Sequence, residues 1–137
     1  MGRIGLNVEL ASPEETLAFG RTMAAQLPRG AILALSGDLG AGKTTFVQGL
    51  AQGLGIADRV QSPTFVLLNI YEGLYHFDLY RLKNSKDFTK LGFEEYFHKE
   101  GICAIEWPDR IAGILPPDTV YIDFSYEKNG RRAVVKP

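Results

Sequence analysis

The first half of the chain predicts an alternation of strands and helices. Hydrophobic residues alternate weakly over residues 4–10, as expected of an edge strand. Ser12-Pro13-Glu14-Glu15 has the form of a helix capping box, which predicts a helix from Pro13 to about Leu27. The apolar run over residues 31–36 predicts a buried strand, and helical spacing predicts a helix over residues 44–54. The side chains expected to face inward on the first helix are those of Leu17, Gly20, Ala24 and Leu27.

The second half of the chain predicts two hairpins and several short elements. Residues 64–71 and 74–78 are rich in strand-forming residues and flank the turn Glu72-Gly73. Residues 120–126 and 132–135 flank Lys128-Asn129-Gly130 in the same way. The other predicted elements are a helix over residues 91–99, a strand over 102–106 and a short helix over 108–114. This order predicts an α/β fold: a single three-layer domain over residues 1–137, whose mixed sheet joins a parallel core to antiparallel hairpins.

The most specific motif is the segment Gly37-Asp38-Leu39-Gly40-Ala41-Gly42-Lys43-Thr44, a complete G-x-x-x-x-G-K-[ST] phosphate loop. It stands between a predicted buried strand and the start of a predicted helix, where helix N–H groups favour bound anions. Lys43 would meet the β- and γ-phosphates and Thr44 a magnesium ion. The alternative is a chance glycine-rich turn, but both flanks fit a P-loop NTPase-like fold. The residues predicted to bind the nucleotide here are Asp38, Leu39, Gly40, Ala41, Gly42, Lys43, Thr44 and Thr45.

Two acidic residues at predicted strand ends are candidates for completing this site. A phosphate loop needs a second magnesium-directed acid, usually at the end of a neighbouring strand. Glu106 directly follows the buried run 102–105, although aspartate is more usual there; otherwise it is an exposed strand end. Asp78 ends the strand over residues 74–78 and would contact the metal or orient the attacking water, unless it is a helix cap. The division of metal-binding and catalytic roles between the two acids stays open.

Other polar residues allow a functional and a structural interpretation. Ser62-Pro63-Thr64 fits a switch segment near the γ-phosphate, or simple turn chemistry. His76 is more typical of a hydrogen-bonded structural histidine than of a ligand. Arg81 and Arg110 are candidate phosphate clamps or surface ion pairs. Asn84-Ser85-Lys86-Asp87, which we expect to lie in a polar loop, lacks the order Asn-Lys-x-Asp of guanine-specific GTPases and therefore gives no evidence for GTP.

Composition narrows the possible classes of protein. The 137 residues carry a net charge of −1, which argues against a domain built chiefly to grip nucleic acid. A local basic cluster remains either a contact patch or a solvated hairpin end. The one cysteine, Cys103, cannot form an intrachain disulfide and lies in an apolar run, so we expect a buried thiol. No apolar run approaches the length of a membrane span, and we expect a soluble cytoplasmic protein. The basic cluster comprises Lys128, Arg131, Arg132 and Lys136.

Four segments taken together resemble one family, the TsaE (YjeE) family. They are residues 37–45, Ser62-Pro63-Thr64-Phe65, the run His76-Phe77-Asp78-Leu79-Tyr80-Arg81-Leu82, and Ile105-Glu106-Trp107-Pro108. The likeness runs in order from about Ser12 to Trp107 and is looser beyond. The family consists of bacterial ATPases required for the threonylcarbamoyl modification of adenosine in tRNA.

The resemblance implies a small protein that binds ATP with Mg²⁺ and hydrolyses it weakly alone. It implies work with TsaB and TsaD, which transfer the threonylcarbamoyl group to tRNA, and hence indirect contact with tRNA. By this resemblance Lys43 and Thr44 hold phosphate and Mg²⁺, and Thr64 belongs to a switch-like segment. Asp78 and Glu106 are the acids tied to metal and hydrolysis, and Trp107 lies beside the site.

Two other functions compete with this one. A small-molecule kinase would use the same loop, but it would need an arginine-rich lid and an acceptor pocket for which the chain has little spare length. A non-catalytic nucleotide switch would bind partners without using hydrolysis. Phosphate transfer to a metabolite would favour the first, and full tRNA modification by Glu106→Ala and Asp78→Ala variants the second.

Overall fold

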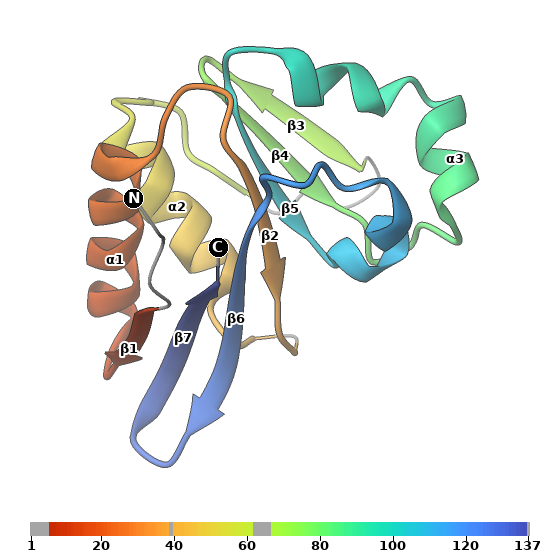
Figure 1. Cartoon of the computed structure of the whole chain (residues 1–137). Coiled ribbons are helices and arrows are strands. Elements are labelled where there is room, and N and C mark those ends of the chain that lie inside the picture. Colours follow the sequence, from red (N-terminus) through yellow and green to blue (C-terminus); the bar gives the residue numbers. More distant parts are fainter. Residues whose placement is uncertain (1–5, 39, 62–66, 137) are drawn as a thin grey trace.

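The fold is described by a computed structural model covering residues 6–38, 40–61 and 67–136. Within these residues, seven strands form one sheet in the order β1-β7-β6-β2-β5-β4-β3 (Figure 1). The strands are β1 (Leu6–Leu10), β2 (Ile32–Ser36), β3 (Leu68–Tyr71), β4 (Leu74–Asp78), β5 (Ile102–Glu106), β6 (Val120–Glu127) and β7 (Gly130–Lys136).

The centre of the sheet is parallel and its margins are antiparallel. Strand β2 pairs in parallel with β5 and β6, and β5 pairs in parallel with β4. The hairpins β3–β4 and β6–β7 and the edge strand β1 add antiparallel pairs. All residues of β5 are buried, as a strand covered on both faces requires. The predicted mixed α/β sheet is therefore confirmed.

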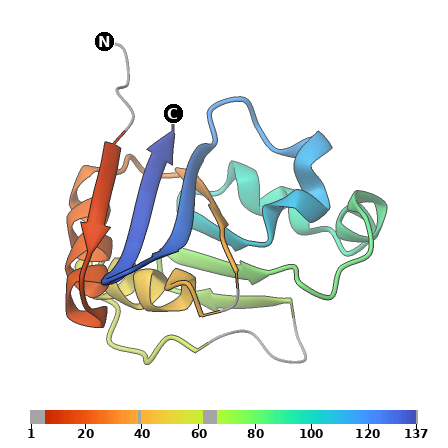
Figure 2. The ribbon, with the colours of Figure 1, turned by 90° about the horizontal axis from the view of Figure 1, so that it is seen from below.

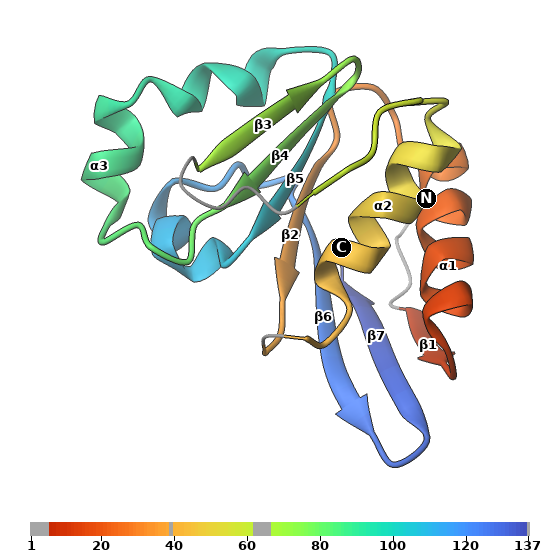
Figure 3. The same cartoon turned by 180° about the vertical axis from the view of Figure 1, so that it is seen from behind.

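Two helices cover one face of the sheet, α1 (Pro13–Gln26) and α2 (Lys43–Gly53) (Figure 3). They pack closely because glycine stands at the crossing: a Cβ added at Gly49 would lie 2.2 Å from the Leu17 carbonyl oxygen. Likewise, a Cβ at Gly20 would lie 2.4 Å from the carbonyl oxygen of Phe46. The aromatic rings of Phe19, Phe46 and Phe124 then join α1, α2 and β6 in one core.

The start of α1 has the predicted N-cap Ser12 with Pro13 as the first helical residue, but the inward face of the helix is only partly as predicted. The N–H of Glu15 donates to the Ser12 side chain at 3.2 Å, and Ser12 is the N-cap. Leu17 and Ala24 are half-buried and contact α2 at its glycines. A different row of residues on α1 is buried in the core. A helix that meets both a sheet and a second helix buries two stripes, of which the sequence pattern identified one. The buried residues of α1 are Thr16, Phe19, Gly20 and Met23.

The opposite face is covered by α3 (Ser85–Lys90) and by two 3₁₀ segments, η1 (Phe93–His98) and η2 (Pro108–Ile114). The predicted helix over residues 91–99 is thus wrong in type, and the interpretation of residues 84–87 as a loop is wrong. The Asn84 side chain accepts from the Asp87 N–H at 3.0 Å and caps α3. An aromatic cluster of Phe77, Phe88 and Phe93 anchors this layer to β4.

The twisted sheet separates the two layers and exposes one edge at which strand ends meet. In Figure 2, α1 and the strands β1, β7 and β6 lie at one end of the molecule and α3 at the other. Since β2, β4, β5 and β6 are parallel, their carboxyl ends share one edge of the sheet, the lower edge in Figure 1. Ligands of open α/β sheets bind at such edges. No helix of the described residues is long and apolar enough to cross a membrane.

Candidate nucleotide site

The phosphate loop connects β2 to α2 at this shared edge. Gly40 and Gly42 adopt φ values of 79° and 109°, which residues with a side chain rarely adopt. Gly42 is the N-cap of α2, so the first N–H groups of that helix belong to the loop. Lys43 and Thr44 begin α2, and Thr45 lies half-buried in its first turn. Leu39, also predicted to bind the nucleotide, lies outside the described residues.

Lys43 is a buried cation, with 4% of the residue exposed. Its Nζ donates to the Gly37 carbonyl at 2.5 Å and lies 3.9 Å from the centroid of the Trp107 ring. Burial lowers the pKa of Lys43, and the charges of Glu106, then Asp78, oppose that shift. The loop thus holds a poorly solvated ammonium group, whose charged form a nearby anion would stabilise.

The two predicted acids lie side by side at this edge. Asp78 and Glu106 are register partners on the parallel strands β4 and β5. The Thr44 hydroxyl donates to Glu106 Oε2 at 3.2 Å, so the start of α2 is joined to the end of β5. The structure thereby brings together Lys43, Thr44, Asp78 and Glu106, although Lys43 and Glu106 are 63 positions apart in the sequence.

Glu106 is the more buried acid of the pair, with 4% exposed, whereas Asp78 is half-buried. Burial raises the pKa of Asp78, a Tyr80 backbone N–H lowers it, and the neighbouring Glu106 charge raises it. That N–H donates to Asp78 Oδ1 at 3.1 Å in a local turn rather than at a helix start. The interpretation of Asp78 as a helix cap is therefore wrong, although its Oδ1 does accept a hydrogen bond from a backbone N–H.

Trp107 forms one wall of the site and has an unusual backbone. Its φ and ψ are 60° and 53°, a left-handed conformation that costs free energy for a bulky residue. This turn sends η2 away from the end of β5 and leaves the indole against Lys43. The Tyr80 ring packs on the indole with centroids 5.0 Å apart. The sequence placed Trp107 beside the site only by resemblance, and the geometry agrees.

The expected hydrogen bond of His76 is present, and its partner is Glu106. The side chain is fully buried and its Nε2 lies 2.6 Å from Glu106 Oε2. The sequence signal was the alternation in β4, which puts His76 on the face of Asp78. Only the pairing of β4 with β5 adds Glu106 to that face.

The basic hairpin cluster divides into two groups. Arg132 forms ion pairs with Glu9 and Glu127, and Lys136 pairs with Asp123, as expected of a solvated hairpin. Arg131 differs, because its Nε donates to the Gly40 carbonyl of the phosphate loop at 3.3 Å. Its guanidinium also lies 4.2 Å from the centroid of the Tyr126 ring. Sequence reasoning missed this contact between the hairpin and the loop.

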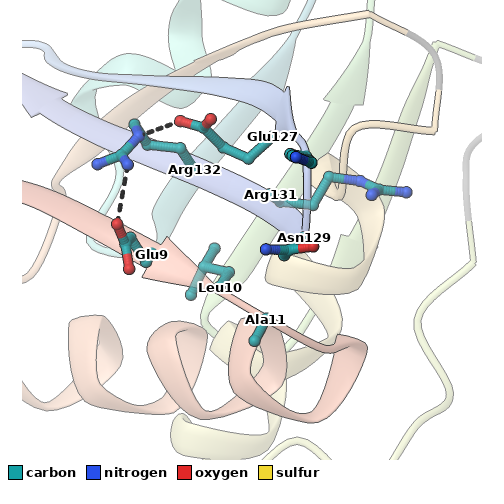
Figure 4. A pocket seen from close by; sticks show the side chains of 8 residues that line it. Glu9, Leu10, Ala11, Glu127, Asn129, Arg131 and Arg132 are labelled. Atoms are coloured by element: carbon teal, nitrogen blue, oxygen red, sulfur yellow. Dashed lines mark hydrogen bonds and ion pairs between the residues drawn. The ribbon is translucent and has the colours of Figure 1, made fainter.

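Beside this contact is a pocket of about 250 Å³ between the end of β1 and the β6–β7 turn. Figure 4 shows Arg131 and Arg132 pointing in opposite directions from β7, with Arg132 bound to Glu9 and Glu127. Asn129 and Ala11 line the pocket on the same side as Arg131. Of the residues that line the pocket, Arg131 is the one that also contacts the phosphate loop among the described residues.

The remaining candidates are paired with other groups, exposed, buried as a thiol or outside the described residues. Arg110 forms a surface ion pair with Asp109 and donates to the Tyr80 carbonyl, and Arg81 is exposed. Thr64 and the rest of its predicted switch segment lie outside the described residues. Cys103 is buried, and burial raises the pKa of its thiol to about 12, which opposes a nucleophilic role.

The donor set suits Mg²⁺ and a polyphosphate. Mg²⁺ prefers hard oxygen ligands, and the cluster offers the Thr44 hydroxyl with the carboxylates of Glu106 and Asp78. The buried ammonium of Lys43 suits the phosphates that such an ion accompanies. The residues present therefore fit both predicted ligands.

Fold and loop together define the class of protein, an α/β protein with a phosphate-loop sequence between a buried central strand and a helix. The family model for the threonylcarbamoyl adenosine biosynthesis protein TsaE matches residues 10–134. The chain belongs to the TsaE family.

Individual relatives agree with this assignment. The tRNA threonylcarbamoyladenosine biosynthesis protein TsaE of Treponema pallidum is 43% identical over 126 residues, covering 90% of this chain and 93% of that protein. The Bacillus subtilis protein of the same name is 45% identical over 115 residues, 81% of this chain and 72% of its own. The crystal structure of YdiB from Bacillus subtilis superposes with a TM-score of 0.83 at 37% identity, covering 96% of this chain and 84% of that one.

Proposed function

We propose that this chain binds ATP with Mg²⁺ and hydrolyses it weakly, as the ATPase subunit that works with TsaB and TsaD in tRNA threonylcarbamoyladenosine formation. The observation that carries the proposal is the cluster of Lys43, Thr44, Asp78 and Glu106 at one edge of the sheet. Its relatives are named for the same modification. Work on tRNA with these partners would be done in the cytoplasm, and tRNA would be reached through them.

Lys43 would bind the β- and γ-phosphates. Its ammonium donates to the Gly37 carbonyl, a weaker partner than a charged phosphate oxygen. Because its burial already disfavours the charged form, an anion in the loop recovers much of that cost. The first N–H groups of α2, next to its N-cap Gly42, would add to the attraction.

Glu106 and Thr44 would hold the metal, and Asp78 would orient or deprotonate the attacking water. Glu106 already accepts from Thr44, the hydroxyl expected at Mg²⁺. Bound Mg²⁺ would neutralise phosphate charge during hydrolysis. Asp78 is less buried and has a raised pKa, which suits a group that takes a proton from water.

The base and ribose would leave the loop on the side of the β6–β7 turn. Arg131 and Tyr126 stand next to Gly40 there, and the adjoining pocket is open. A guanidinium and an aromatic ring offer flat faces on which a nucleobase can stack. We expect this contact to contribute to affinity for ATP.

The test is nucleotide binding and turnover by the purified chain with and without TsaB and TsaD. We expect Lys43→Ala to abolish measurable ATP binding, and Glu106→Gln to retain metal-free ATP binding while losing turnover. The exposed Lys83 provides a matched control, since Lys83→Ala removes a lysine outside the loop.

Three outcomes would contradict the proposal. The first is ATP binding that survives Lys43→Ala. The second is turnover and tRNA modification that do not respond to the two partners. The third is phosphate transfer to a metabolite, which would instead identify a small-molecule kinase.

A further inference from the structure

His76 lies on β4 two residues before Asp78, on the face of the sheet that also carries Glu106. Strand β4 sets His76 opposite Ala104 of β5, and two residues later sets Asp78 opposite Glu106. Alternate residues of a strand share a face, so His76, Asp78 and Glu106 point to the same side of the sheet. That side is the one covered by α2, because Ala104 packs in the core cluster with Phe46 and Leu50.

The direction of the contact between His76 and Glu106 follows from its chemistry. Nε2 of His76 lies 2.6 Å from Glu106 Oε2, and an ionised carboxylate can only accept. We therefore assign the hydrogen to Nε2, which donates it. The same Oε2 accepts from the Thr44 hydroxyl at 3.2 Å, so one carboxylate oxygen is held from β4 and from α2 at once.

A purely structural role does not explain His76 well, because burying its imidazole costs folding free energy. His76 is 0% exposed, and its Nδ1 has no hydrogen-bond partner among the described residues. A buried polar atom without a partner destabilises the fold, and an apolar side chain would fill the same space without that cost. What the imidazole supplies and an apolar side chain would not is the donor to Glu106.

We propose that His76 is a positioning residue for the metal, which holds the Glu106 carboxylate toward Thr44 before a divalent cation arrives. A glutamate side chain has three rotatable bonds, and fixing them costs conformational entropy when the ion binds. The bond from His76 fixes the carboxylate in advance, as partners of metal ligands commonly do. This inference rests on the proposed function, because it takes Glu106 as a ligand of Mg²⁺.

The first experiment separates metal binding from nucleotide binding. His76→Gln keeps an N–H donor at a similar reach, whereas His76→Leu fills the space without one. Mn²⁺ affinity is measured by electron paramagnetic resonance in the presence of saturating ATP, and ATP affinity is measured separately in EDTA. We expect His76→Leu to weaken Mn²⁺ binding by about 10- to 100-fold, with His76→Gln close to the unmodified protein. ATP affinity in EDTA should be the same in all three proteins.

The outcomes distinguish this inference from the proposed function. If the unmodified protein binds ATP and Mn²⁺, and His76→Leu binds Mn²⁺ equally well, the positioning role is wrong and the proposed function stands. If the unmodified protein binds neither ligand, the proposed function fails. A loss of Mn²⁺ and metal-free ATP binding together in a folded His76→Leu variant would also overturn the positioning role, since it would mean general damage to the site.

A second measurement needs no folded leucine variant. The chain contains two histidines, and His98 is exposed, so ¹⁵N spectra of the imidazoles contain one buried and one solvated ring. We expect His76 to carry its proton on Nε2, shifted downfield and exchanging slowly with water, and Glu106→Ala to abolish the shift. A proton on Nδ1 with none on Nε2, or an unchanged signal in Glu106→Ala, would overturn the inference.

Discussion

The ammonium of Lys43 lies 3.9 Å from the centroid of the Trp107 indole, so the phosphate-loop lysine packs on an aromatic face. A cation–π contact of this kind is worth up to about 2 kcal/mol when it is shielded from water. The same ammonium is bonded to the Gly37 carbonyl. Both contacts compete with a phosphate for Lys43.

We therefore predict that ATP binding changes the fluorescence of Trp107. The chain has one tryptophan, so tryptophan emission reports the surroundings of Trp107, which include Lys43. Phosphates should draw the Lys43 ammonium away from the ring and alter intensity and wavelength in titrations corrected for nucleotide absorption. Lys43→Met should show altered emission without nucleotide and no response to ATP. Unchanged emission at saturating ATP in the unmodified protein would contradict this prediction.

Asp78→Asn is expected to stabilise the fold at neutral pH. The folded-state pKa of Asp78 is raised from 3.8 by burial, so this residue contributes stability that is fully present below 3.8 and lost as pH rises through the folded pKa. Asparagine has no charge to bury and keeps the oxygen that accepts from the Tyr80 N–H.

Urea unfolding without metal or nucleotide measures this effect between pH 7 and pH 4. The gain from Asp78→Asn should be largest at pH 7 and shrink as pH falls toward 4. The exposed Asp58 provides the control substitution, Asp58→Asn. A gain that is absent at pH 7, or that grows on acidification, would refute the assignment of burial as the dominant cause.

Gly49→Ala is expected to destabilise the protein despite the higher helix propensity of alanine. The added Cβ would lie 2.2 Å from the Leu17 carbonyl oxygen, so α1 must move away from α2. Overpacking of this kind costs about 1–3 kcal/mol, against a propensity gain of about 1 kcal/mol. Chemical denaturation should show the net loss. Gly113→Ala places the same methyl in open space and should leave the free energy of unfolding nearly unchanged.

Arg131→Ala is expected to weaken ATP binding about fivefold, because one hydrogen bond to the loop carbonyl of Gly40 is lost. Arg132→Ala is the matched control, since Arg132 is the next residue in β7 and pairs with Glu9 and Glu127 instead. Isothermal titration of both variants with ATP measures the difference. Equal affinities for the two variants would show that the hairpin does not support the loop.

The sequence predicted the elements whose local pattern is strong. The buried strand β2, the N-cap at Ser12 and the order of both hairpins needed only local spacing and turn chemistry. Helix α3 escaped prediction because it is six residues long and begins in a polar segment that also fits a loop. The 3₁₀ segment η1 is only six residues long, and over that length its pattern of apolar residues cannot be told from that of a short α-helix.

The site was predicted as a set of residues but not as an arrangement. Lys43 and Thr44 follow from one motif, and Asp78 and Glu106 follow from their places at strand ends. The bond between His76 and Glu106 depends on which strand lies beside β4, a fact that local pattern does not contain. The contact of Arg131 with Gly40 joins residues 91 positions apart, beyond any short-range signal.

That last contact sets an order of events for a chain emerging from the ribosome. The phosphate loop is translated before β6 and β7, and β6 is the neighbour of β2 that carries Tyr126 toward Gly40. A nascent chain that ends before Arg131 therefore carries the complete loop sequence without the hairpin that contacts it. A partly synthesised chain of this kind should therefore hold ATP less tightly than the finished domain, and the full affinity should appear only once the hairpin has folded.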